Sequence, residues 1–128
     1  MIQQRKSDPA TNWALRVIIA VVFSLVGAEK FSSNPASSWV HVFAAIGLGQ
    51  WFRYFTGIVE IVGGLLFLIP AATTVGAAML IATMCGAMIV HLFVFRHPGD
   101  AIFPGLYLAA VVFAYAKLRD MRRAEKGR

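Results

Sequence analysis

Residues 61–95 read IVGGLLFLIPAATTVGAAMLIATMCGAMIVHLFVF, and this run contains no Asp, Glu, Lys or Arg. A helix that crosses a bilayer needs about 20 predominantly apolar residues. The run is therefore long enough for the end of one span, a turn at Pro70, where proline removes a backbone donor, and a complete second span. A water-soluble core does not need so long an uncharged stretch, so the sequence predicts several membrane-spanning helices.

The composition of the whole chain supports the same conclusion. Of its 128 residues, 59% are hydrophobic and 14% are charged, and the mean hydropathy is +0.69. A soluble domain has roughly 45–50% apolar and about 25% charged residues. These values exclude an ordinary soluble globular protein, and the length predicts one domain over residues 1–128.

The pattern along the chain predicts an all-α fold, a polytopic four-helix transmembrane bundle. The expected spans cover residues 13–31, 53–69, 73–95 and 101–116, with a polar N-terminal tail at 1–12 and a basic C-terminal tail at 117–128. Apolar residues at helical spacing follow a turn-rich loop and predict an interfacial helix at 38–51, between spans one and two. Arg16 lies near the start of span one, where we expect its long side chain to extend to the headgroups.

Positive charge is concentrated at the end of the chain. The net charge is +6, and six of the 12 basic residues follow the last span: Lys117, Arg119, Arg122, Arg123, Lys126 and Arg128. Such an excess can indicate a nucleic-acid partner, but basic residues directly after an apolar span favour cytoplasmic anchoring. With Arg5, Lys6 and Arg16, the side of the termini carries nine basic residues, against three on the other side: Lys30, Arg53 and Arg96. We therefore expect a multi-pass protein of the cell (inner) membrane with both termini cytoplasmic, and no nucleic-acid partner.

Glu60 is the most informative ionisable residue, because it lies about two turns inside the second expected span. A charge at the bilayer centre costs about 2.5–3.5 kcal/mol even on the mildest scale. Arg53, seven residues earlier, lies on about the same helix face, and Gly57 and Gly64 leave room on that face for a partner helix, a ligand or a side chain. We expect Glu60 to face the interior of the bundle.

Three further residues lie at the ends of spans that should meet Glu60 in an up-down bundle. Glu29 and Lys30 end span one, and His91 lies about one turn from the corresponding end of span three. Together with Arg53 and Glu60 they are the ligand-binding candidates, and Glu60 and His91 are also the catalytic candidates. Two interpretations remain open: a polar pocket that binds a headgroup or moves protons, and a structural clasp that joins helices.

The remaining reactive side chains predict little chemistry of their own. Cys85 is the single cysteine, so the chain has no CxxC dithiol and no intrachain disulfide. His41 and His97 form no recognised metal spacing with His91, and we expect neither a metal site nor a cofactor of the chain's own. A stripe of small residues at Ala78, Ala82 and Gly86 predicts a close helix contact, within the chain or between copies.

GQWFRYFTGIVEIVGGLLFLIP at 49–70, GAEKF at 27–31 and CGAMIVHLFVF at 85–95 resemble the DoxX-like family of small bacterial membrane proteins. The resemblance covers roughly residues 13–116 and implies a four-helix membrane bundle. It singles out five residues, Glu29, Lys30, Arg53, Glu60 and His91. Members take their name from a subunit of a thiosulfate:quinone oxidoreductase, and others are described as parts of membrane redox complexes that handle oxidative stress.

The resemblance implies an accessory subunit of a membrane redox system, or a subunit that binds a quinone-like lipophilic molecule. Its expected partners are the lipid bilayer, a quinone or similar small molecule, and a membrane oxidoreductase subunit or a second copy of the chain. One alternative is a stand-alone membrane enzyme in which Glu60, with His91 or Glu29, transfers protons on a lipid-soluble substrate. A small transporter and a purely structural bundle are the others.

Overall fold

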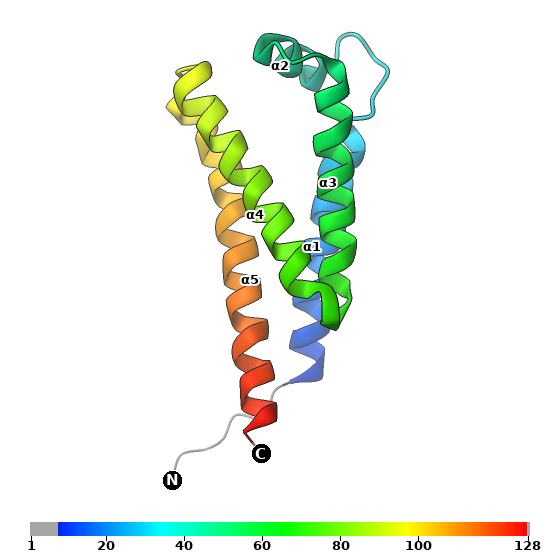
Figure 1. Cartoon of the computed structure of the whole chain (residues 1–128), viewed down its shortest axis with the longest axis vertical. Helices are drawn as coiled ribbons and strands as arrows, with labels where there is room; N and C mark the ends of the chain where they lie inside the picture. The colour runs from blue at the N-terminus through cyan, green and yellow to red at the C-terminus, as the bar shows by residue number, and fades with distance from the viewer. Residues whose placement is uncertain (1–7, 128) are drawn as a thin grey trace.

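The computed structural model describes residues 8–127, and in this part of the chain every regular element is helical (Figure 1). The main helices are α1 (Pro9–Glu29), α2 (Ser38–Ile46), α3 (Gln50–Leu68), α4 (Thr73–Ile89) and α5 (Ile102–Lys126). Short helical segments connect them: η1 (Pro70–Ala72), η2 (Val90–Val94) and η3 (Pro98–Ala101). Four segments are long and apolar enough to cross a membrane: Pro9–Glu29, Gln50–Leu68, Pro70–Val94 and Pro98–Lys126. The predicted all-α class with four spans is confirmed.

The four long helices form two pairs, α1 with α3 and α4 with α5, and the contact of α4 with α3 joins the pairs. α1 lies along α3, and α4 starts beside the end of α3 and crosses to α5 (Figure 1). The start of α1 and the end of α5 lie at one end of the bundle, which we call the termini end, and α2 lies at the other. The buried core between the helices is apolar and contains Phe23, Phe67, Leu80, Val111 and Leu118.

α1 begins four residues before the expected start of span one. Asp8 is its N-cap, and its carboxylate accepts a hydrogen bond from the Ala10 backbone N–H at 3.0 Å. Pro9 follows at the first helical position, where its missing N–H leaves no bond unmade.

The interfacial helix predicted at 38–51 is wrong in extent. α2 ends at Ile46, and α3 begins at Gln50, three residues before the expected start of span two. Gly47 and Gly49 separate the helices with φ angles of +83° and +94°. Glycine adopts this left-handed backbone without steric penalty, so the two glycines turn the chain from the covering helix into the span.

α5 extends well beyond the expected end of span four. The segment predicted as a basic tail from residue 117 is helical as far as Lys126. Leu118 and Met121 are buried in this part of α5, so its apolar face continues past the last hydrophobic run. The six basic residues therefore belong mostly to a helix that packs on the bundle.

The crossing of α3 and α4 depends on two glycines. A Cβ on Gly76 would lie 2.6 Å from the carbonyl oxygen of Gly63 and 2.9 Å from the Phe67 nitrogen, closer than atoms can approach. The predicted small-residue stripe does not make this contact, because Ala78, Ala82 and Gly86 are exposed. The stripe lies on a different face of α4 from Gly76.

We expect Gly76→Ala to destabilise the bundle by about 1–3 kcal/mol, because its methyl group overpacks a backbone contact. Gly86→Ala is the matched control in the same helix, since a Cβ there meets nothing within 4 Å. Unfolding of the two purified variants by heat or SDS measures the difference. Equal stability of the two variants would contradict the claim that the crossing of α3 and α4 requires glycine at position 76.

Candidate functional site

A buried ion pair joins α1 to α3. Lys30 Nζ lies 2.6 Å from Glu60 Oε1, and the two side chains are 6% and 0% exposed. The helices touch through their backbones nearby, since a Cβ on Gly27 would lie 2.7 Å from the Gly57 carbonyl oxygen. Glu60 therefore faces the interior, and the room that Gly57 provides is taken by α1.

Arg53 binds the backbone that follows α1 and makes no ion pair with Glu60. Its Nη1 donates to the carbonyl oxygens of Lys30 and Ser32, the latter at 3.0 Å, and its Nε donates to Gln50 Oε1 at 2.7 Å. These bonds hold the end of α1 against α3. Arg53 is thus a positioning residue for Lys30, which is the cation that meets the carboxylate.

Aromatic side chains of α2 cover the ammonium group of Lys30. Its Nζ lies 4.8 Å from the ring centroid of Trp39 and 5.7 Å from that of Phe43, within the range of cation–π attraction. Phe43 is buried and packs edge-on against Phe52 of α3 at 5.8 Å. The short helix therefore encloses the ion pair from the side away from the termini.

One oxygen of the pair remains without a partner. Glu60 Oε2 is buried, and no hydrogen bond in the described part of the chain reaches it. A buried carboxylate oxygen in this state can accept a hydrogen bond from a ligand or carry a proton. The site thus offers a donor, Lys30 Nζ, beside an unoccupied acceptor.

Glu29 and His91 lie outside this arrangement. Glu29 is exposed and accepts a hydrogen bond from the indole N–H of Trp39 at 3.5 Å. His91 lies in the π-helical segment η2, its ring packs against Phe95 at 5.5 Å, and its Nδ1 is buried without a partner. The structure brings Lys30, Arg53 and Glu60 together and leaves the other two candidates unbonded to Glu60.

Family comparison agrees with this bundle. Residues 14–114 match the DoxX-like family. The chain belongs to this family. Together with the four apolar helices, this makes the DoxX-like chain a multi-pass membrane protein.

A curated relative of this DoxX-like protein is "Putative oxidoreductase CatD" of Bacillus subtilis (strain 168). The two are 30% identical over 103 residues, which cover 80% of this chain and 75% of the relative. No solved structure matches the chain. Among residues 8–127, no group of His, Cys, Asp and Glu is arranged to hold a metal ion.

The DoxX-like bundle has a third buried cation, Arg16, in addition to Lys30 and Arg53. Its side chain is 5% exposed and bonds within the bundle, an arrangement that the prediction of a chain extended to the headgroups did not include. Its Nε donates to Asn12 Oδ1 at 2.8 Å, and its Nη1 donates to the Phe67 carbonyl at 2.9 Å and to Thr73 Oγ1. The α3 helix ends just before Pro70, so its last carbonyls lack helical donors, and Arg16 supplies one. Only the packing of α1 on the α3–α4 turn reveals this role.

We expect Lys30→Met to destabilise the protein by about 3 kcal/mol, because it leaves the buried Glu60 carboxylate without its cation. The double variant Lys30→Met/Glu60→Leu should recover most of the loss, since no buried charge then remains. Glu29→Gln, a change at an exposed neighbour, serves as the control and should have little effect. Stability is measured by thermal or SDS unfolding. A Lys30→Met variant as stable as the parent would refute the ion pair.

Proposed function

We propose that this DoxX-like protein is a membrane-embedded subunit of a redox system that binds the head of a quinone-like lipophilic molecule at Lys30 and Glu60. The observation that carries the proposal is the buried, unpartnered Glu60 Oε2 beside the ammonium of Lys30. Buried polar atoms without partners are rare in proteins, because each has given up its hydrogen bonds to water. A ligand with a polar head and an apolar body restores the missing bond within a bilayer.

The pair is chemically suited to both redox forms of such a ligand. A quinone carbonyl accepts a hydrogen bond from Lys30 Nζ, and a quinol hydroxyl donates one to Glu60 Oε2. The rings of Trp39 and Phe43 lie beside the ammonium and offer faces for an aromatic head to stack on. Because these rings cover Lys30, ligand entry requires α2 to shift from its position on α3.

The comparisons support the redox setting in general terms. The relative is named "Putative oxidoreductase CatD", and this chain belongs to the DoxX-like family. Cys85 is the single cysteine of the chain, so any dithiol step needs a second thiol from elsewhere. For this reason we place the protein beside a partner, an oxidoreductase subunit or a second copy, in the cell (inner) membrane. The count of nine basic residues against three supports cytoplasmic termini.

A structural clasp is the second candidate function. It is favoured by the hydrogen bonds of Arg53 to the Lys30 and Ser32 carbonyls, which fix α1 whether or not a ligand binds. A stand-alone enzyme with a Glu60–His91 or Glu60–Glu29 proton pair has less support. In the described structure the side chain next to Glu60 is that of Lys30, and neither His91 nor Glu29 is bonded to it.

Titration of the purified protein with decylubiquinone, followed by quenching of tryptophan fluorescence, tests the proposal. We expect saturable binding that Glu60→Gln weakens about tenfold, the effect of losing one charge-assisted hydrogen bond. Glu29→Gln is the matched acid-to-amide control and should bind as the parent does.

A second variant keeps the test decisive. If Glu60→Gln does not fold, Lys30→Met/Glu60→Leu takes its place, because it carries no unpaired buried charge and should fold without binding. Absence of saturable binding by the folded parent protein, or equal affinity of Glu60→Gln and Glu29→Gln, would leave the structural clasp as the function.

A further inference from the structure

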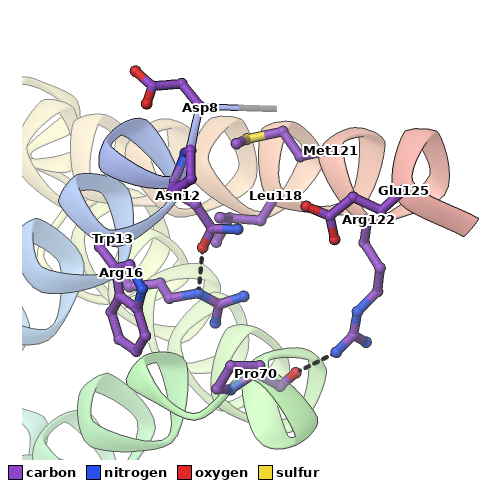
Figure 2. Close-up of a pocket in the computed structure, with 10 residues that line it drawn as sticks. Asp8, Asn12, Trp13, Arg16, Pro70, Leu118, Met121, Arg122 and Glu125 are labelled. Atoms are coloured by element: carbon purple, nitrogen blue, oxygen red, sulfur yellow. Dashed lines mark hydrogen bonds between the residues drawn. The ribbon is translucent and has the colours of Figure 1, made fainter. Parts of the chain in front are cut away.

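A cavity of about 270 Å³ lies at the termini end of the bundle, far along α1 from Lys30 (Figure 2). It is bounded by the first turns of α1, by Pro70, and by the last turns of α5. A smaller cavity of about 50 Å³ shares Arg16, Pro70 and Arg122 with it and adds Arg119. None of these residues belongs to the Lys30–Glu60 site.

Two guanidinium groups from different helices face the larger cavity. Arg16 of α1 is fixed by bonds to Asn12, Phe67 and Thr73, and these engage its Nε and Nη1. Arg122 of α5 is held by one bond, from its Nη2 to the Pro70 carbonyl at 2.9 Å. In the described part of the chain, the hydrogen bonds thus leave Arg16 Nη2 and two nitrogens of Arg122 available to a ligand. Figure 2 shows Arg16 extending from α1 and Arg122 extending from α5 to the Pro70 carbonyl.

Neutral donors and acidic residues complete the lining. The amide of Asn12 accepts from Arg16 through its oxygen, so its NH₂ is free to donate, and the indole of Trp13 lies beside it. The carboxylate of Asp8 already accepts bonds from the Ala10 N–H and the Thr11 hydroxyl at the start of α1. Glu125 is exposed and also lines the cavity. The deepest charge is therefore that of Arg16, and it is positive.

The position and the donor geometry select a phosphate group. Guanidinium groups bind phosphate oxygens strongly, and here Arg16 offers its Nη2 while Arg122 offers its Nε and Nη1. Both groups carry a positive charge and line the same cavity, so an anion between them would relieve their mutual repulsion. Trp13 is half exposed near the start of a membrane-spanning helix, the level at which tryptophan meets lipid headgroups.

We propose that the cavity between Arg16 and Arg122 is a phosphate-binding site. Its ligand is the phosphate of an anionic lipid headgroup or of a soluble phosphate compound. The bound phosphate bridges α1 and α5 and so ties the basic end of α5 to the bundle.

The test is a titration of the full chain in a neutral detergent, followed by tryptophan fluorescence, with three probes. These are dihexanoyl phosphatidylglycerol, inorganic phosphate, and dihexanoylglycerol, which lacks the phosphate. Arg122→Gln removes one guanidinium of the site, and Arg123→Gln removes the same charge from the next residue, which is exposed and does not line either cavity. Both substitutions are on the surface, so both variants should fold.

Saturable binding of a phosphate-bearing probe should be preserved in Arg123→Gln and weakened about tenfold in Arg122→Gln, as for a lost charge-assisted hydrogen bond. Tighter binding of phosphatidylglycerol than of inorganic phosphate identifies a lipid headgroup as the source. Binding of inorganic phosphate with equal or greater affinity identifies a soluble phosphate. Equal affinities of the two variants, or equal binding of dihexanoylglycerol, would overturn the proposal.

Discussion

Charged side chains inside a bilayer have no water to solvate them, so they must find partners within the protein. In this chain that constraint is met by Lys30 and Glu60, whose ion pair is almost fully buried between α1 and α3. Arg53 secures the cation by binding the backbone around it. The covering helix α2, the loop before it and the end of α1 are all arranged around this one interaction.

Glycine contacts make such pairing possible. Gly27 and Gly57 let the backbones of α1 and α3 approach until a lysine on one helix reaches a glutamate on the other, and Gly76 does the same for α4 against α3. At the opposite end of the bundle, Arg16 donates a hydrogen bond to the Phe67 carbonyl, which lies in the last turn of α3 and lacks a helical donor. The bundle is therefore held by buried cations near both of its ends, with an apolar core between them.

The four spans could be predicted from the sequence because an apolar, uncharged run of this length matches the thickness of a bilayer. The inward position of Glu60 could be predicted as well, since a carboxylate is costly in lipid. Lys30 was expected at the same polar site but not as the ion-pair partner of Glu60, because Arg53 shares a helix face with Glu60, whereas contacts between helices depend on the packing. The inward position of Arg16 was missed for the same reason. The break in the helix expected at 38–51 was visible in principle, since Gly47 and Gly49 stand two residues apart.

The central claim is that the Lys30–Glu60 ion pair exists in the bilayer. Magnetic-resonance recoupling between ¹⁵N-labelled lysine side chains and ¹³C-labelled glutamate carboxyl carbons, in protein reconstituted into lipid, tests it directly. The structure predicts a strong short-range coupling that disappears in Glu60→Gln. Absence of the coupling in the parent protein, or its persistence in Glu60→Gln, would contradict the account.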